Sequence, residues 1–346
     1  MRSRSLVLGA VGAAMSGLAV SAPAVADPVA DFYKNNAITV ILPIGPGGTY
    51  DFYGRLGAAI MEKHLPGNPK VITQLMTGAG GAKASNYMAS VAPKNGTFLV
   101  SLHASAPQNQ VLGVTGIRYD LGKFLMVGQF LPLNSSLTVW KATSPAKTIQ
   151  EAMQKEVILG STGKGSYQYQ LPALLNVMTG TKFKIVLGYK SVSEENLAME
   201  QGEIHGRGGT TVSWAITQPA WVKEDKIAHL VQVGTKRARG FEDVPLATEL
   251  VKTEADRQAL NLVSGGALMG RSLASTPGVP ADRAKALRAA FDKGVKDPEI
   301  LAKAKEWKLD LDPASGEELQ KVVAGILSTP PAVVEKVKQL LDIKKK

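Results

Sequence analysis

Short apolar runs with strand character alternate with longer amphipathic segments along this chain, and the alternation occurs twice. In the first series, strands are expected over residues 38–42, 71–76 and 97–102, and helices over 50–64 and 82–91. Alternation of this kind predicts an α/β protein built on parallel sheets.

The second series begins beyond residue 150. It predicts strands over 156–159, 184–187 and 227–233, with helices over 167–177 and 193–201 between them. Two such series indicate two sheets joined by crossing segments.

The remaining third of the chain is mainly helical in pattern. The apolar run 259–268 is interpreted as a further strand. Apolar residues then recur on one helical face from Ala284 to Val295, and the segment 317–341 is helical with an interruption at Pro330. A chain of this length can bury a large core and favours two lobes over one.

The N-terminus has the pattern of a secretory signal peptide over residues 1–26. Arg2 and Arg4 precede an apolar run from 6 to 20, and the tripeptide 24–26 is Ala-Val-Ala. The run is shorter than the roughly 20 apolar residues that span a bilayer, so cleavage after Ala26 and a periplasmic location are expected. A retained N-terminal anchor is the alternative. No later stretch is long and apolar enough to span a membrane.

Composition narrows the chemistry of the mature chain. Of the 40 basic residues, two lie in the leader, which leaves 38 against 29 acidic residues and a net charge of +9. Positive charge attracts anions. A nucleic-acid partner is not expected, because the lysines are dispersed and arginines are not interleaved with aromatic residues. The chain has no cysteine, so thiol chemistry and thiolate metal sites are excluded.

Catalytic and metal-binding patterns are also missing from the sequence. The four histidines, His64, His103, His205 and His229, have no metal-binding spacing. There is no Gly-x-Ser-x-Gly elbow or His-Glu-x-x-His helix. We therefore predict no enzymatic activity, no metal and no cofactor.

A glycine-proline loop between the first strand and the first long helix is the most informative stretch. Residues 45–51 read Gly-Pro-Gly-Gly-Thr-Tyr-Asp. Such a loop leaves backbone N–H groups exposed at a helix N-terminus, where carboxylate or phosphate binds readily. The alternative is a plain tight turn in which Asp51 only caps the helix.

Two further glycine loops also lie between a strand and a helix. Residues 77–81 read Thr-Gly-Ala-Gly-Gly, and residues 160–166 read Gly-Ser-Thr-Gly-Lys-Gly-Ser. The second of these lacks the spacing of a P-loop, and its hydroxyls and amides suit carboxylate oxygens better than a triphosphate. Three such loops together favour an anion site over three ordinary turns.

Single residues outside the loops add to the candidate site. His103 follows a strand and is either a ligand contact or a structural histidine. Arg207 is either a bidentate carboxylate clamp or part of an ion pair between structural elements. Tyr50, Tyr53, Tyr189 and Trp214 either line a cleft for an aromatic acid or pack within the lobes.

Several short motifs, taken in order, resemble the solute receptors of tripartite tricarboxylate transporters, also called Bug-type receptors. The motifs are Pro46-Gly47-Gly48 with Asp51 and Arg55, Pro66-Gly67-Asn68-Pro69, Gly78-Ala79-Gly80-Gly81, Ala92-Pro93-Lys94-Asn95-Gly96-Thr97, Gly188-Tyr189, Asp243-Val244-Pro245 and Pro277-Gly278-Val279-Pro280. The resemblance extends over nearly the whole mature chain. Tyr50, where the family often has a small residue, and the segment 207–214 depart from its pattern.

The resemblance implies a type II periplasmic-binding-protein fold, with two α/β lobes joined by crossing strands and a ligand cleft between them. Lobe 1 would comprise 27–130 plus 259–346, and lobe 2 would comprise 131–258. A small organic anion, such as an aromatic acid or a dicarboxylic acid, would be captured by hinge closure and delivered to membrane permease subunits. Together with the residues argued above, it predicts a ligand site formed by Gly45, Pro46, Gly47, Gly48, Thr49, Tyr50, Asp51, Gly80, His103, Ser161, Thr162, Gly163, Ser166, Tyr189, Arg207 and Thr210.

Two other functions stay open at this point. A receptor of the same fold can report its ligand to a membrane two-component kinase. An exported hydrolase using Ser161 or Ser166 is the other alternative, although the sequence offers no base beside either serine. In each case a monomer is expected.

Overall fold

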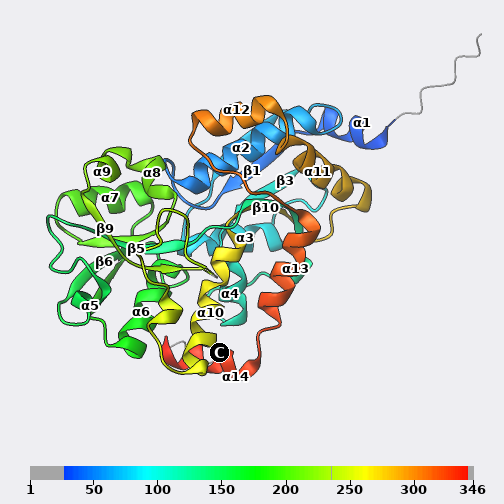
Figure 1. Ribbon diagram of the computed structural model, residues 1–346. Helices are drawn as coiled ribbons and strands as arrows, with labels where there is room; N and C mark the ends of the chain where they lie inside the picture. The colour runs from blue at the N-terminus through cyan, green and yellow to red at the C-terminus, as the bar shows by residue number, and fades with distance from the viewer. Residues whose placement is uncertain (1–26, 235, 342–346) are drawn as a thin grey trace, which may run out of the picture.

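The computed structural model describes residues 27–234 and 236–341. The expected signal peptide and the last five residues lie outside this range. The described chain forms two α/β lobes, each built on its own sheet (Figure 1).

Lobe 1 contains a six-stranded mixed sheet. Its order is β11-β4-β10-β3-β1-β2. The strands are β1 (Ile38–Leu42), β2 (Val71–Leu75), β3 (Phe98–Leu102), β4 (Leu125–Leu131), β10 (Arg271–Ser275) and β11 (Ala314–Ser315). Strands β2, β1 and β3 are parallel, as the sequence predicts, whereas β10 runs antiparallel to β3 and β4.

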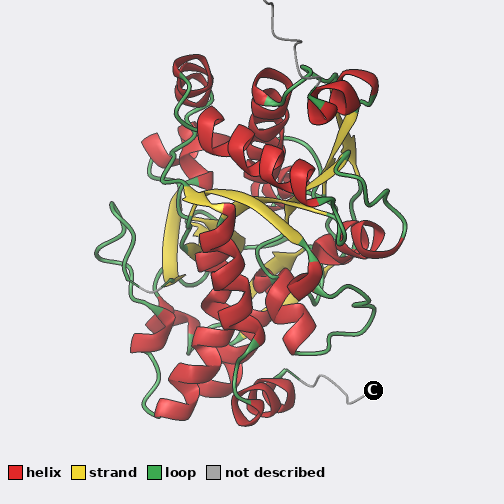
Figure 2. Cartoon of the chain, turned by 90° about the vertical axis from the view of Figure 1, so that its right-hand side faces the viewer, coloured by secondary structure: helices red, strands yellow, loops and turns green. Residues whose placement is uncertain are grey.

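Helices cover both faces of this sheet (Figure 2). Strand β1 explains this arrangement, because all five of its residues are buried. Val40 and Leu42 belong to one core cluster, and Ile41 belongs to another. Successive side chains of a strand point to opposite faces, so an unbroken apolar strand requires cover on both sides. The helices of lobe 1 are α1 (Pro28–Asn35), α2 (Thr49–His64), α3 (Ala82–Ser90), α4 (Ala106–Val111), α11 (Ala281–Gly294), α12 (Pro298–Glu306) and α13 (Gly316–Leu327).

Lobe 2 contains a five-stranded sheet of order β7-β6-β8-β5-β9. Its strands are β5 (Ser135–Trp140), β6 (Val157–Ser161), β7 (Phe183–Leu187), β8 (Gly206–Thr210) and β9 (Ile227–Val233). Its helices are α5 (Ile149–Ala152), α6 (Tyr167–Thr179), α7 (Val192–Glu200), α8 (Ser213–Thr217) and α9 (Pro219–Lys223).

The chain crosses between the lobes twice, and the two crossings touch. The first is the short link from β4 to β5, and the second runs through helix α10 (Glu254–Met269) to Gly270. The N–H of Leu133 donates to the carbonyl of Ala267 at 2.9 Å, which joins the two crossings directly. This pair of adjacent links is the only covalent connection between the described sheets, and it has the geometry of a hinge.

The prediction of a strand over 259–268 is wrong, because these residues lie within α10. The helix begins at a capping residue, Thr253, whose side chain accepts a hydrogen bond from the N–H of Asp256. Apolar residues are buried on several faces of α10 because it packs against α4, α6, α13 and the last helix, α14 (Pro331–Leu340). Burial on several faces weakens the amphipathic period, and a ten-residue apolar run then resembles a strand.

Candidate ligand-binding site

The first glycine loop joins β1 to α2 and is fixed by Asp51. Gly48 is the N-cap of α2 and provides no side chain to satisfy the first amides of the helix. The carboxylate of Asp51 accepts from the N–H of Gly47 at 3.1 Å and from Nε of Arg55 at 2.7 Å. The Gly47 amide is therefore engaged within the loop. Asp51 shapes the loop, but it accepts from the residue before the N-cap and not from an amide of the helix.

The same loop lies directly against lobe 2. A Cβ placed on Gly45 would be 2.8 Å from Cβ of Ser191, which precedes α7. A Cβ on Gly47, whose φ is 81°, would be 3.1 Å from Oγ of Ser193. The lobes approach so closely here that only glycine fits at position 45 without displacing lobe 2.

The second and third glycine loops also meet across the cleft. A Cβ on Gly80 would lie 3.2 Å from the backbone nitrogen of Ser166. Beside this contact, Nδ2 of Asn109 in lobe 1 donates to the carbonyl of Gly165 at 2.8 Å, and its Oδ1 accepts from Nε2 of Gln170 at 2.9 Å. Asn109 and Gln170 are each 1% exposed. The structure is therefore a closed conformation of the two lobes.

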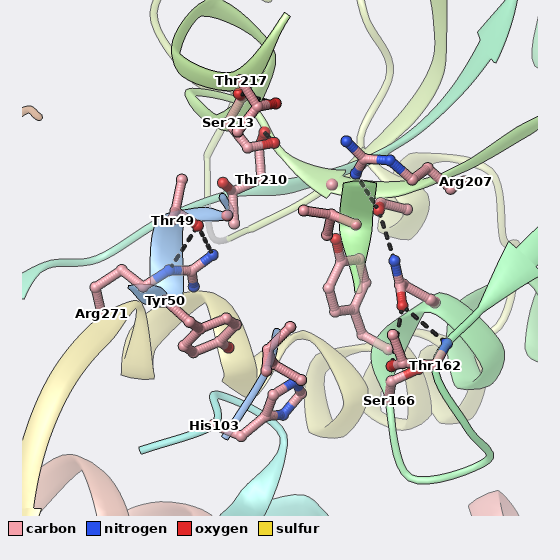
Figure 3. A pocket seen from close by; sticks show the side chains of 17 residues that line it. Thr49, Tyr50, His103, Thr162, Ser166, Arg207, Thr210, Ser213, Thr217 and Arg271 are labelled. Atoms are coloured by element: carbon pink, nitrogen blue, oxygen red, sulfur yellow. Dashed lines mark hydrogen bonds between the residues drawn. The ribbon is translucent and has the colours of Figure 1, made fainter. Parts of the chain in front are cut away.

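A partly open cavity of about 50 Å³ lies between the closed lobes (Figure 3). It is several times larger than the roughly 10–15 Å³ that one water molecule needs. Its walls come from both lobes: Ile44, Gly48, Thr49, Tyr50, His103 and Arg271 from lobe 1, and Thr162, Ser166, Tyr167, Gln168, Val192, Arg207, Gly208, Gly209, Thr210, Ser213 and Thr217 from lobe 2.

Arg271 is the charged group that lobe 1 brings to the cavity. Its Nε and Nη2 donate to Oγ1 of Thr49 at 3.0 and 2.6 Å, and its Nη1 donates to the carbonyl of Gly270. Because Oγ1 of Thr49 accepts both of these bonds, its own hydrogen is available to donate toward the cavity. No ion pair to Arg271 occurs within residues 27–234 and 236–341.

The guanidinium of Arg271 is supported by a stack of two rings. It lies 3.9 Å from the centroid of Tyr50, and the Tyr50 ring stacks on His103 with centroids 5.0 Å apart. The hydroxyl oxygen of Tyr50 accepts from the N–H of Ala104 at 2.9 Å, which fixes the ring. Burial, and then the charge of Arg271, lower the pKa of His103 to about 3. His103 is thus neutral near pH 7 and adds no positive charge.

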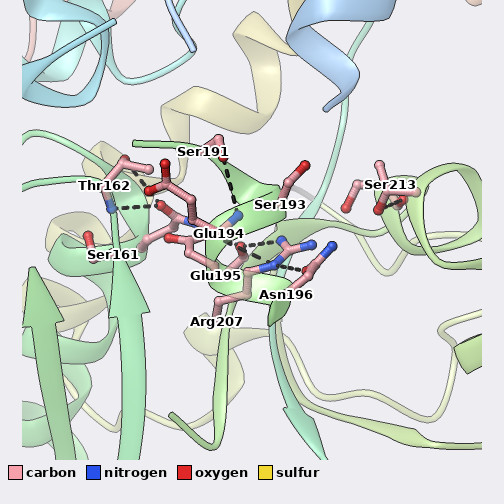
Figure 4. A network of polar contacts seen from close by, with 12 residues as sticks. Ser161, Thr162, Ser191, Ser193, Glu194, Glu195, Asn196, Arg207 and Ser213 are labelled. Atoms are coloured by element: carbon pink, nitrogen blue, oxygen red, sulfur yellow. Dashed lines mark hydrogen bonds and ion pairs between the residues drawn. The ribbon is translucent and has the colours of Figure 1, made fainter. Parts of the chain in front are cut away.

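Arg207 is the charged group of lobe 2, and it is 1% exposed. Its Nε donates to Oδ1 of Asn196 at 2.8 Å, and its Nη1 donates to the carbonyl of Gly208 at 3.0 Å (Figure 4). Its guanidinium lies 3.9 Å from the ring centroid of Trp214. Its Nη2 has no hydrogen-bond partner among the described residues.

The carboxylate behind Arg207 belongs to Glu195. Its Oε2 lies 3.8 Å from Nε of Arg207 and accepts from Nε2 of Gln168 at 2.9 Å. Burial raises the pKa of Glu195 to about 7, and the charge of Arg207 opposes this rise. Glu195 is therefore only partly ionised near neutral pH and compensates the charge of Arg207 incompletely.

Tyr167 lies within electrostatic reach of both arginines. Burial raises the pKa of its hydroxyl, and the charges of Arg207 and Arg271 each lower it. Nearby, Oγ1 of Thr210 is buried without a hydrogen-bond partner in the described structure. The closed cavity thus combines positive charge with unpaired hydrogen-bonding groups, which is the chemistry of an anion site.

The chain is similar in sequence to one curated protein. No protein-family model matches the chain. The BugT protein of Bordetella pertussis is 27% identical over 248 residues, which cover 68% of this chain and 73% of BugT. In sequence, the chain is therefore similar to a Bug protein over most of its length.

Solved structures of Bug/TctC-type proteins share the two-lobed fold. A TctC solute-binding protein from Polaromonas has a TM-score of 0.57 at 24% identity, covering 90% of this chain and 99% of its own. The periplasmic binding protein BugD has a TM-score of 0.69 at 18% identity, covering the same shares. MatC from Rhodopseudomonas palustris, solved with bound malate, has a TM-score of 0.67 at 19% identity, covering 89% and 99%.

The structure brings half of the sequence-predicted site residues to the cavity. Gly48, Thr49, Tyr50, His103, Thr162, Ser166, Arg207 and Thr210 line it. The others lie outside the cavity wall. They are Gly45, Pro46, Gly47, Asp51, Gly80, Ser161, Gly163 and Tyr189.

The residues outside the wall have identifiable roles in the structure. Gly45, Gly47 and Gly80 permit the close approach of the lobes. The hydroxyl of Ser161 bonds to Gly163 and lies 3.0 Å from Oγ of Ser166, within the third loop. The ring of Tyr189 instead packs against Gly160, away from the cavity.

Of the aromatic residues weighed from sequence, only Tyr50 lines the cavity. Tyr53 is buried against Phe130 in the core of lobe 1, and its hydroxyl donates to the carbonyl of Asp310. Trp214 lies beside the guanidinium of Arg207 rather than on the cavity wall.

Arg271 is the most important residue that sequence reasoning missed. It opens β10, whose five residues are all buried. No local motif marks it, but an arginine in a buried apolar segment is rarely tolerated without a functional or paired environment. That rule is the one sequence signal that points to it.

The described residues contain no cluster of His, Cys, Asp and Glu side chains that could hold a metal ion. Among the helices of the described part of the chain, none combines the length and apolar character needed to traverse a bilayer.

Proposed function

We propose that this chain is an exported periplasmic receptor that captures a small organic anion bearing a carboxylate and delivers it to a permease of the tripartite tricarboxylate type. The observation that carries the proposal is the closed cavity, into which each lobe contributes one buried arginine. Buried charge is costly unless it is paired, and a carboxylate pairs well with guanidinium.

The mechanism we propose is hinge closure around the ligand. Lobe 1 would comprise residues 27–130 plus 259–346 and lobe 2 residues 131–258, with the touching crossings as the hinge. This division follows the two sheets, although the limit near residue 258 falls inside α10. Closure excludes water and strengthens the charged hydrogen bonds to the ligand.

The proposed location and partners follow from the leader and from the solved relatives. The leader 1–26 predicts export, and the solved relatives include periplasmic binding proteins. Malate in MatC supports a carboxylate as the ligand class. A monomeric receptor presenting its closed form to permease subunits is the simplest arrangement. Reporting the ligand to a membrane kinase is compatible with the same site.

The hydrolase alternative gains no support from the third loop. The hydroxyls of Ser161 and Ser166 bond to one another and to Gly163. No hydrogen bond joins either serine to a histidine in the described part of the chain. Serine nucleophiles require such a base.

A thermal-shift screen of the mature protein against mono-, di- and tricarboxylates, including aromatic acids, tests the proposal. A ligand at 100 times its dissociation constant stabilises the folded protein by about 2.7 kcal/mol. We expect at least one carboxylate to raise the melting temperature. Stabilisation by phosphates or nucleotides and by no carboxylate would show that the proposed ligand class is wrong.

A further inference from the structure

Two arginines from opposite lobes line the same closed cavity. Arg207 lies on β8 of lobe 2 and Arg271 on β10 of lobe 1, and they are 1% and 4% exposed. Both lower the pKa of Tyr167, so both charges act on one point of the site. Closure therefore brings two like charges together and removes both from water.

The groups around the cavity compensate this charge only in part. Glu195 lies 3.8 Å from Arg207 and is the one acidic side chain paired with either arginine among the described residues. The nearby carboxylate of Asp51 is engaged by Arg55. His103 is neutral. The side chains around the closed cavity consequently carry net positive charge.

Arg271 retains donors for a bound anion. Three of its five N–H groups are used, on Thr49 and Gly270, which leaves two. In Arg207, both hydrogens of Nη2 are unused. These donors, together with the hydroxyl of Thr49, are suited to acid oxygens placed between the lobes.

We infer that Arg207 and Arg271 make closure depend on the charge of the ligand: without an anion their uncompensated charge opposes closure, and a bound anion removes that opposition. The inference rests on the proposed receptor function and adds a specificity mechanism to it. A neutral molecule of the right shape fits the cavity but does not neutralise the arginines, so it fails to close the lobes. Burying an unpaired charge is unfavourable enough to control a conformational equilibrium of this kind.

The test measures closure in the ligand-free protein, so it does not depend on knowing the ligand. The chain has no cysteine, so cysteines introduced at Val91 of lobe 1 and Leu197 of lobe 2, which are 67% and 52% exposed, can be spin-labelled selectively. Double electron–electron resonance then gives the distance between the lobes and the closed fraction.

Four variants separate charge from shape. Arg271→Met removes the charge, whereas Arg271→Lys keeps it. Arg207→Met is combined with Glu195→Gln, so that no buried carboxylate is left unpaired. Arg283→Met is the matched control, because Arg283 stacks on Phe32 at 3.6 Å but lies outside the cavity.

We expect the ligand-free wild type, the Arg271→Lys variant and the Arg283→Met variant to be predominantly open. Arg271→Met should raise the ratio of closed to open molecules by roughly tenfold or more, and the Arg207→Met/Glu195→Gln variant should raise it by a smaller factor, because it also removes the partial negative charge of Glu195. The inference is overturned if the neutralising variants stay as open as wild type, if Arg271→Lys closes as far as Arg271→Met, or if the ligand-free wild type is already closed. A negative carboxylate screen with the expected closure pattern would contradict the proposed function alone.

Discussion

Replacing Gly45 with alanine should weaken ligand binding without weakening the fold. The added Cβ would lie 2.8 Å from Cβ of Ser191 in the closed form. Carbon atoms in good contact are about 3.5–4.0 Å apart, so the lobes must separate locally by roughly 1 Å. Gly45 does not have a positive φ, so alanine introduces no backbone strain in the loop itself.

The expected loss of affinity of Gly45→Ala follows from the free-energy cost of the clash with Ser191, which arises only in the closed form. Extra methyl groups in well-packed contacts cost about 1–3 kcal/mol. Gly45 and Ser191 belong to different lobes, so the clash exists only when the lobes are closed. A penalty of this size on the ligand-bound state alone corresponds to a roughly 5- to 150-fold rise in the dissociation constant.

A second substitution should restore the affinity. In the double variant Gly45→Ala/Ser191→Gly, the clashing Cβ is gone, and the next atoms are 3.5 and 3.8 Å from the new methyl. Ser191 caps α7 by accepting from the N–H of Glu194, but replacing a serine cap with glycine costs only a few tenths of a kcal/mol. The pair thus forms a double-mutant cycle whose coupling measures the contact between the lobes.

Isothermal titration calorimetry with a carboxylate identified by the screen gives the affinities, and urea unfolding without ligand gives the stabilities. Gly325→Ala is the control, since its Cβ would have no atom within 4 Å. The reasoning is refuted if Gly45→Ala binds as tightly as wild type, or if Ser191→Gly does not recover the lost affinity.

Two further substitutions test other parts of the site. Asn109→Ala leaves the carbonyl of Gly165 unpaired and leaves Nε2 of Gln170 with only its 3.4 Å bond to the carbonyl of Lys164, so we expect a roughly 5- to 100-fold loss of affinity by calorimetry; an unchanged dissociation constant would contradict the interlobe role. Glu195→Gln should alter the pH dependence of stability, because from pH 4.5 to about 7 folded wild type keeps a proton that the unfolded chain has released. Wild type should therefore lose stability relative to the variant as pH rises through this range, by about 1.4 kcal/mol per unit, and a constant difference in urea unfolding would exclude this.

The sequence predicted the elements whose signals are local. The segment from β1 to α2 is an example: five apolar residues, a glycine-proline loop and an amphipathic helix follow one another, and the observed bounds Ile38–Leu42 and Thr49–His64 agree closely with the expectation. Strand β8 was not recognised, because three of its five residues are glycine. Glycine is depleted in strands, and β8 forms only because β5 and β6 pair with it on both sides.

Helix α10 is the opposite case: part of it was predicted as a strand, but it is a helix. Its apolar residues are buried by helices from both lobes, so the pattern that distinguishes helix from strand is erased by tertiary contacts. The capping residue Thr253, followed three residues later by Asp256, was the remaining clue. Helix starts of this kind deserve more weight than apolar runs when the two disagree.

The sequence indicated individual residues of the candidate site, but not which residues of the two lobes contact one another. Glycine loops at strand–helix junctions were expected at a ligand cleft, and in the structure they lie where the lobes meet; whether a glycine offers an amide or permits a close approach depends on the opposite lobe. Gly45 and Ser191 are far apart in the sequence, as are Tyr50 and Arg271. No spacing rule connects such residues, so their contacts can only be read from the folded chain.

The glycines and the arginines make separate contributions to the same equilibrium, and their variants should act in opposite directions. A methyl group at Gly45 obstructs the closed form whether or not ligand is present. Removing the charge of Arg271 should favour the closed form when the cavity is empty, while also removing a contact that the anion needs. Loss of affinity accompanies both changes, but only the second should increase closure in the ligand-free protein. Because affinity alone cannot distinguish an obstructed hinge from a missing charge, the distance between the lobes is the measurement that separates shape from electrostatics in the proposed receptor.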